Sequence, residues 1–232
     1  MKTPRPLAAV AVLALALPLA ACSSDKSKDA DSTSSATATT ATAMASTDAM
    51  ADSNSAASAD GQKVTASTAG ISFLVPSDWT VISDPSNLDE DVVEAAAKAV
   101  GQDPATYKAS MKHVDLLVSS QEAKAIGSLP YADNIIVARQ TFPKSQVPTD
   151  ERSASEFAKA TGASSMTKYE KISTTNGEAT VVHYEVTVKD GTGYGAVVFA
   201  PTSEGSHAAI TVTATEASMA DKLAAQVTSS VK

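Results

Sequence analysis

The spacing of apolar residues predicts four helices after residue 63. Leu88, Val92, Ala96 and Val100 recur at helical spacing, which predicts a helix over 88–100. Acidic residues crowd its first turn, where the helix dipole favours anions, and Gly101 follows its last turn. The other three helices are expected to begin at Asp103-Pro104, at a capping box Ser153-x-x-Glu156, and near Ala217, the last of them ending near Val231.

Short apolar runs and alternating segments predict an antiparallel sheet. The expected strands are 70–75, 114–119, 134–140, 168–174, 178–189, 194–200 and 208–215. Asn176-Gly177 is a strong signal for a tight hairpin between two of them. In the long strand 178–189, apolar residues such as Val182 alternate with polar residues such as His183. The predicted fold class is therefore α+β, a largely antiparallel sheet flanked by helices.

The first 21 residues have the zones of an export signal. Lys2 and Arg5 form a short basic segment, and an uncharged apolar stretch follows from Pro6 to Ala21. This stretch has about 16 residues, fewer than the ~20 needed to span a bilayer. We therefore expect residues 1–21 to be a cleaved signal peptide, and not a permanent membrane helix.

A cysteine stands at the end of this signal. Leu19, Ala20 and Ala21 precede Cys22, the single cysteine of the chain. This order resembles the bacterial lipobox, and the resemblance implies that Cys22 becomes the mature N-terminus and carries a diacylglyceryl group. Two acyl chains on one residue suffice for stable anchoring. We expect a protein lipid-anchored on the extracytoplasmic face of the cell membrane; the alternative is an ordinary signal peptide cut at an Ala-x-Ala site, without lipid.

Residues 22–62 are expected to form a tether between the lipid and a folded domain over 63–232. From Ser23 to about Gln62 the chain is almost entirely Ser, Thr, Ala and Asp, without aromatic residues. Such a segment cannot bury enough apolar surface to offset the entropy of ordering, which predicts disorder. Its threonines either form an unmodified spacer or carry O-linked sugars.

Charge and cysteine usage exclude several classes of function. The net charge is -8, and loss of Lys2 and Arg5 with the signal makes the mature chain still more acidic. An acidic chain without a basic cluster argues against nucleic-acid binding. Because Cys22 is expected to carry lipid, neither a disulfide nor a catalytic thiol remains.

The folded part resembles a known family. Residues 70–79 read Gly-Ile-Ser-Phe-x-Val-Pro-x-x-Trp, and Asp133–Val137, the Asn-Gly hairpin and a closing helix follow. This pattern over about 64–232 is similar to PsbP-like domains, a family that includes bacterial lipoproteins, among them the actinobacterial LpqN type. The resemblance implies a helix–sheet–helix sandwich that serves as a binding or assembly accessory. Because the family shares no catalytic residues, none is transferred to this chain.

Catalytic and metal-binding motifs are sparse. The three histidines are His113, His183 and His207. His183 and Glu185 share one strand face, but a metal site needs a third ligand and no known spacing supplies it. We expect each histidine to be hydrogen-bonded within the fold or to face solvent. There is also no Gly-x-Ser-x-Gly motif and no phosphate-binding glycine loop, so no catalytic residue, metal or cofactor is predicted.

Aromatic residues offer the one candidate contact surface. Trp79 follows the first predicted strand, Tyr131 precedes Asp133-Asn134, and Tyr194 stands between two glycines. They either cover the edges of the sheet or together contact a partner or ligand.

Three functions remain open at this point. The first is a non-enzymatic lipoprotein that binds an unidentified envelope protein or ligand. The second is an envelope hydrolase whose site is assembled only by folding. The third, a solute-binding lipoprotein, is less favoured because such proteins usually need two lobes, and this chain has the length for one domain.

Overall fold

The structure, a computed structural model, describes residues 61–99, 102–188 and 190–232. The predicted signal peptide, Cys22 and the tether as far as residue 60 lie outside these residues. The strands are β1 (Gln62–Ala66), β2 (Ile71–Val75), β3 (Thr80–Ser83), β4 (Val114–Ile126), β5 (Leu129–Phe142), β6 (Ser165–Thr174), β7 (Gly177–Val188), β8 (Gly191–Pro201) and β9 (His207–Ala214). The α-helices are α1 (Glu90–Ala99), α2 (Pro104–Met111), α3 (Glu151–Ala160) and α4 (Ala217–Ser230), with short 3-10 turns at Pro85–Asn87 and Lys144–Gln146.

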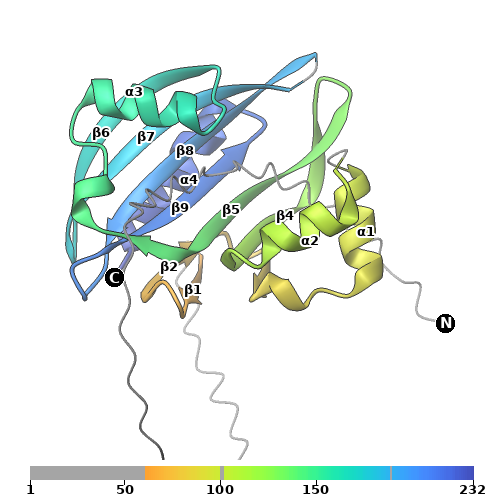
Figure 1. Cartoon of the computed structure of the whole chain (residues 1–232), viewed down its shortest axis with the longest axis horizontal. Coiled ribbons are helices and arrows are strands. Elements are labelled where there is room, and N and C mark those ends of the chain that lie inside the picture. The colour runs from red at the N-terminus through yellow and green to blue at the C-terminus, as the bar shows by residue number, and fades with distance from the viewer. Residues whose placement is uncertain (1–60, 100–101, 189) are drawn as a thin grey trace, which may run out of the picture. The chain divides into compact units, whose positions relative to one another are not determined.

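Seven strands form one antiparallel sheet, and helices cover both of its faces. The strand order is β3-β4-β5-β9-β8-β7-β6, while β1 and β2 form a separate hairpin. Helix α4 and the β1–β2 hairpin pack on one face. Helices α1 and α2 cover the β4 end of the other face, and α3 covers β6 and β7 (Figure 1). The described part is therefore a mixed α+β domain, mostly antiparallel, as predicted.

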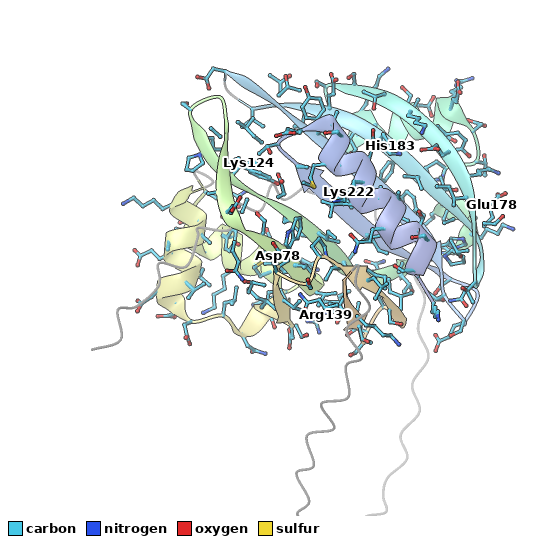
Figure 2. All side chains as sticks on the ribbon, turned by 180° about the vertical axis from the view of Figure 1, so that it is seen from behind. Asp78, Lys124, Arg139, Glu178, His183 and Lys222 are labelled. Carbon is cyan, nitrogen blue, oxygen red and sulfur yellow. The ribbon has the colours of Figure 1, made fainter. Side chains whose placement is uncertain are left out.

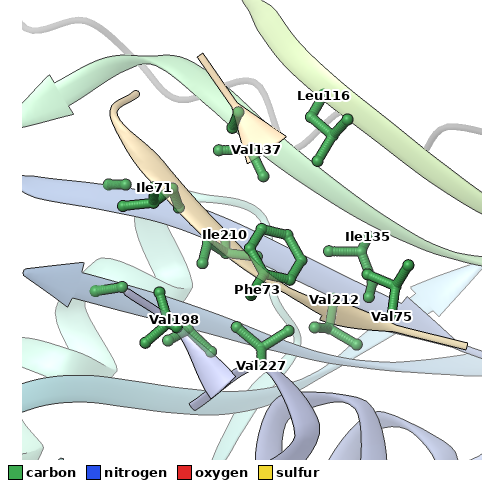
Figure 3. Packing of buried hydrophobic residues seen from close by; sticks show 14 of the residues in the cluster. Ile71, Phe73, Val75, Leu116, Ile135, Val137, Val198, Ile210, Val212 and Val227 are labelled. Carbon is green, nitrogen blue, oxygen red and sulfur yellow. The ribbon is translucent and has the colours of Figure 1, made fainter. Parts of the chain in front are cut away.

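The main core lies between the sheet and α4. It joins Phe73 of β2 and Val227 of α4 to residues of the central strands such as Ile210 (Figure 3). Successive strand residues point to opposite faces, so Val198 belongs to this core while its neighbour Val197 packs beneath α3. Burying each such side chain contributes about 1.5–3 kcal/mol, which makes these two apolar layers the chief source of stability.

The predicted helices are confirmed with small changes at their ends. Asp103 caps α2, where its side chain accepts a hydrogen bond from the backbone N–H of Thr106. In α4, Leu223 and Val227 are buried in the main core. The predicted capping box of α3 is wrong by three residues. Asp150 is the cap and Ser153 its reciprocal partner, because the carboxylate of Asp150 accepts the N–H of Ser153 at 2.8 Å.

Several strands differ from the prediction. β1 and β3 were not predicted, and β1 begins at Gln62, one residue before the expected start of the domain. β4 and β5 extend well past 114–119 and 134–140 to meet at a tight turn after Ile126. The added part of β4 is mostly exposed and polar and breaks register between Ser119 and Ala123, so it lacks the apolar alternation that marks a strand.

The tip of the β4–β5 hairpin docks on the β7–β8 turn. The backbone N–H and hydroxyl of Ser128 donate to Oδ1 of Asp190 at 3.1 and 3.2 Å. Gly127 has φ +57°, a conformation that favours glycine, and any side chain there would collide with Asp190. None of the helices in the described ranges has both the length and the hydrophobicity to cross a membrane.

Candidate functional site

His183 sits at the centre of the strongest cluster of ionisable groups in the described residues. It lies on β7, on the face covered by α4, and its side chain is 8% exposed. Its Nε2 lies 3.0 Å from Oε1 of Glu170, and its Nδ1 lies 2.9 Å from Oδ1 of Asp221. Figure 2 shows His183 between α4 and the strands at the β6 edge of the sheet. We call these three residues the histidine clamp.

The hairpin between β6 and β7 positions two members of the cluster. Thr174 pairs with Gly177 across the turn at Asn176, and this register places Lys168 opposite His183 and Glu170 opposite Val181. Alternate residues of a strand point to one face, so Lys168 and Glu170 both lie on the face of His183. The Nζ of Lys168 is 2.7 Å from Oε1 of Glu170.

The third member comes from a different element. Asp221 lies on α4, which the buried side chains of Leu223 and Val227 hold against the sheet. The carboxylate of Asp221 is 64% exposed, whereas that of Glu170 is 29% exposed. The clamp therefore spans the sheet edge and α4, with its imidazole buried and its helix end open to solvent.

Each ring nitrogen of His183 faces a carboxylate oxygen. A neutral imidazole donates through one nitrogen only, whereas the charged ring donates through both. A hydrogen bond from Lys168, helped by the charges of Lys168 and His183, lowers the pKa of Glu170 against the opposing effect of burial. Glu170 is thus held ionised and accepts from two donors.

This arrangement does little for acid–base catalysis. A general base needs a ring nitrogen within hydrogen-bond reach of a substrate, and both nitrogens of His183 already contact carboxylates. The described residues contain no group of three His, Cys, Asp or Glu side chains suited to a metal ion. The clamp is best explained as a tie between two elements of the fold.

A shallow cavity lies elsewhere, between α1 and α2. It has a volume of about 330 Å³, and its walls are Glu90, Val93, Glu94, Pro104, Ala105 and Lys108. Lys108 and Glu90 form an exposed ion pair at 3.5 Å across it. Its polar lining consists of two carboxylates and one lysine, without a hydroxyl, thiol or imidazole.

The other two histidines have different surroundings. His113 is exposed and follows the end of α2, as the sequence predicted. His207 begins β9 and is 7% exposed. Burial, with a smaller effect of the Lys144 charge, lowers the pKa of His207 and favours its neutral form.

The predicted aromatic residues fall in no common cluster. Trp79 is 9% exposed in the main core, and its carbonyl accepts a hydrogen bond from Gln62. Tyr131 is fully buried beneath the β4–β5 hairpin, where its hydroxyl accepts from Asn134. Tyr194 is half-buried on β8, opposite Glu185. The burial of the first two gives a shared contact surface no support, and that surface stays a prediction.

Together these features define a class: an α+β domain with a mostly antiparallel sheet, helices on both faces and an ion-pair clamp between α4 and one edge of the sheet. No protein family model matches the sequence, and no curated protein matches it either. Among solved structures, the chain is similar to cyanobacterial PsbP (CyanoP) from Synechocystis. The identity is 14%, the match covers 74% of this chain and 94% of that one, and the TM-score is 0.40. A likeness of this degree carries no inference about function.

Proposed function

We propose that this protein is a lipid-anchored lipoprotein of the cell envelope, on the extracytoplasmic side, that binds a partner protein or an envelope ligand without catalysing a reaction. The single observation that carries the proposal is the order Leu19-Ala20-Ala21-Cys22 directly after an uncharged apolar segment. A cysteine in this context is the substrate for lipid attachment, and two acyl chains provide stable anchoring.

The layout of the chain agrees with an anchored binding domain. The first described strand begins at Gln62, so about 40 residues separate it from Cys22. As a flexible coil, a segment of this length spans roughly 35 Å, which lets a domain reach partners above a membrane surface. The acidic net charge argues against nucleic acid as the partner.

We further propose that the domain is a divergent member of the PsbP-like family, related to LpqN-type lipoproteins. The motif over 70–79 supports this, as do the antiparallel sheet, the hairpin at Asn176-Gly177 and the closing helix α4. An experimental structure of the domain with a different strand order from that family would overturn the assignment.

The enzyme alternative finds no specific observation in its favour among the described residues. The most enclosed ionisable cluster uses both nitrogens of His183 for internal contacts. The cavity between α1 and α2 is lined by carboxylates, a lysine and apolar groups. A purified chain that hydrolyses an envelope ester or glycan, and loses this activity with one side-chain change, would contradict the non-enzymatic proposal.

The anchor is tested by replacing the lipidated residue. In cells, the wild-type chain should sediment with membranes, and mass spectrometry of its N-terminal peptide should find acylated Cys22. The Cys22→Ala variant should lose the acyl mass and leave the membrane fraction. A matched control is Ser24→Ala, which changes a neighbouring residue outside the four-residue motif. A Cys22→Ala chain that stays membrane-bound at wild-type size and yield would refute the anchor.

The binding role is tested by crosslinking in intact cells. Photo-crosslinking amino acids placed at exposed positions of α1, α3 and β6 should give a discrete adduct at one surface and none at the others. The Cys22→Ala variant, released from the membrane, should lose that adduct. Equal, diffuse labelling from all three surfaces would argue against a specific partner.

A further inference from the structure

The histidine clamp joins two parts of the fold, the sheet edge and α4, through the imidazole of His183. Histidine is the side chain whose ordinary charge change falls between pH 5 and 8. We propose that His183 is a pH-operated latch for the first half of α4: the charged ring ties Asp221 of the helix to Glu170 of the sheet edge, and loss of its proton frees Asp221.

The charged and titratable groups around the ring come from four elements. On β6, Glu170 contacts the ring and Lys168 pairs with Glu170. On β7 itself, Glu185 lies two residues along on the same face and accepts a hydrogen bond from the hydroxyl of Ser165. On α4, Asp221 contacts the ring, and Lys222 beside it is exposed. On β8, the half-buried Tyr194 lies opposite Glu185. Among these groups only the two clamp carboxylates contact the imidazole, Glu170 through a hydrogen bond and Asp221 as an ion-pair contact at 2.9 Å.

The neutral ring cannot keep both contacts. Its unprotonated nitrogen is an acceptor, and an acceptor facing a carboxylate oxygen is repelled by it. One carboxylate must therefore move away or find a new donor. The geometry determines which carboxylate is released.

Glu170 stays in place because it has a second cation. Its Oε1 lies 2.7 Å from Nζ of Lys168, and its side chain is mostly buried. Asp221 is 64% exposed, and within the described part of the chain His183 is its one ion-pair partner. Water can solvate Asp221 at little cost, so the contact at α4 is the one that opens.

The release stays local to the start of the helix. Leu223, Ala224 and Val227 remain buried in the main core, and the C-terminal residue Lys232 exchanges two backbone hydrogen bonds with Ser72 of β2. These contacts do not involve a titrating group. Loss of the latch therefore loosens the start of α4 as far as Asp221, while the helix from Leu223 onward holds its position on the sheet.

The chain contains a matched control for this proposal. Glu216, at the N-cap of α4, forms an ion pair with Lys124 at 3.3 Å, and its side chain is 62% exposed. It resembles Asp221 in charge, exposure and position on the helix. Its partner is a lysine, which stays charged from pH 5 to 8, so this pair contributes equally across that range.

The test is amide hydrogen exchange of the full chain at pH 5.5 and pH 8.0, corrected for the intrinsic pH dependence of exchange and followed in peptides from the first two turns of α4. An ion pair of this exposure contributes about 0.2–1 kcal/mol, so these amides should open about 1.5- to 5-fold more often at pH 8.0 in the wild-type chain. Asp221→Asn and His183→Gln should each abolish the difference, because neither can form a pair that depends on the ring's charge. Glu216→Gln should keep it.

Each outcome decides the question. Asp221 is largely exposed, so Asp221→Asn tests the latch even if His183→Gln folds poorly. A wild-type chain with equal protection at both pH values would overturn the proposal, as would greater opening at pH 8.0 that survives Asp221→Asn. Loss of the difference in Glu216→Gln would show a general charge effect and would also overturn it. The relevance to ambient pH rests on the proposed envelope location, but the exchange measurement does not depend on the anchor. Its failure would leave the proposed function untouched.

Discussion

Replacing Gly195 by alanine should destabilise the sheet by forcing a buried ring to move. Gly195 lies on β8 opposite Tyr184 of β7, and the aromatic ring of Tyr184 lies over it. A Cβ built at Gly195 would stand 2.7 Å from Cε2 of that ring and nearer still to Cζ and the hydroxyl oxygen. Tyr184 is 2% exposed and packs among the residues beneath α3, so the ring cannot swing into solvent.

The magnitude follows from two opposing contributions. Overpacking of a well-filled interior costs about 1–3 kcal/mol through displaced rotamers and backbone. An alanine in extended backbone reduces the conformational entropy of the unfolded chain, which stabilises the folded state by about 0.4–1 kcal/mol. Gly195→Ala should therefore lower the free energy of unfolding by about 1–2 kcal/mol. At about 2–4 °C per kcal/mol for a domain of this size, Tm should fall by about 2–8 °C.

A double-mutant cycle tests the cause of this loss. Tyr184→Leu removes the ring, so Gly195→Ala made in that background should cost less by about 0.5–3 kcal/mol. The control is Gly193→Ala, whose Cβ would stand 3.2 Å from Cγ1 of Val186 and 3.3 Å from Cδ1 of Ile126, both flexible side-chain ends. Urea unfolding followed by circular dichroism measures all five chains. The reasoning fails if Gly195→Ala is as stable as wild type, or if its cost is unchanged without the ring.

Three further predictions concern stability. Leu223→Ala should lower the free energy of unfolding by about 2–5 kcal/mol because Leu223 is 1% exposed in the main core. Lys222→Ala, which changes the exposed neighbouring residue, should leave the free energy of unfolding almost unchanged, and thermal melts compare the two variants. The pKa of Glu170 is lowered in the folded chain, so its carboxylate stabilises the fold above the ordinary pKa of 4.5, and this stabilisation is lost as the pH falls below that value. In Glu170→Gln, the free energy of unfolding should therefore fall less steeply with decreasing pH below 4.5. Burial also lowers the pKa of His207, so the free energy of unfolding should fall as the pH drops below the ordinary histidine pKa of 6.5. Urea unfolding of His207→Gln between pH 4.5 and 8 should show a weaker dependence of this free energy on pH. A dependence equal to that of the wild type would contradict the role of His207.

Local patterns predicted most of the fold. The apolar spacing in α4 and the alternation in β7 each correspond to one face of one element, and such patterns depend only on burial. The prediction failed where an element is stabilised by contacts outside its own pattern. β3 has four half-buried or exposed residues and exists because Val81 and Ile82 pair with β4. The outer part of β4 and β5 is held by the turn at Asp190, far along the chain.

The partners of His183 in the clamp were only partly predictable from the sequence. His183 was paired in the sequence with Glu185, its neighbour on one strand face, whereas its carboxylate partners are Glu170 and Asp221. Glu170 was within reach of sequence reasoning, because the hairpin at Asn176-Gly177 sets the register that brings it diagonally across from His183.

Asp221 was not within reach. The apolar stripe of α4 shows which face of the helix is buried but not the angle or the height at which it crosses the sheet, and a shift of one turn would place a different residue over His183. The pairing therefore depends on packing of the whole core. For the same reason, the 2.9 Å contact between His183 and Asp221 depends on how α4 docks on the sheet.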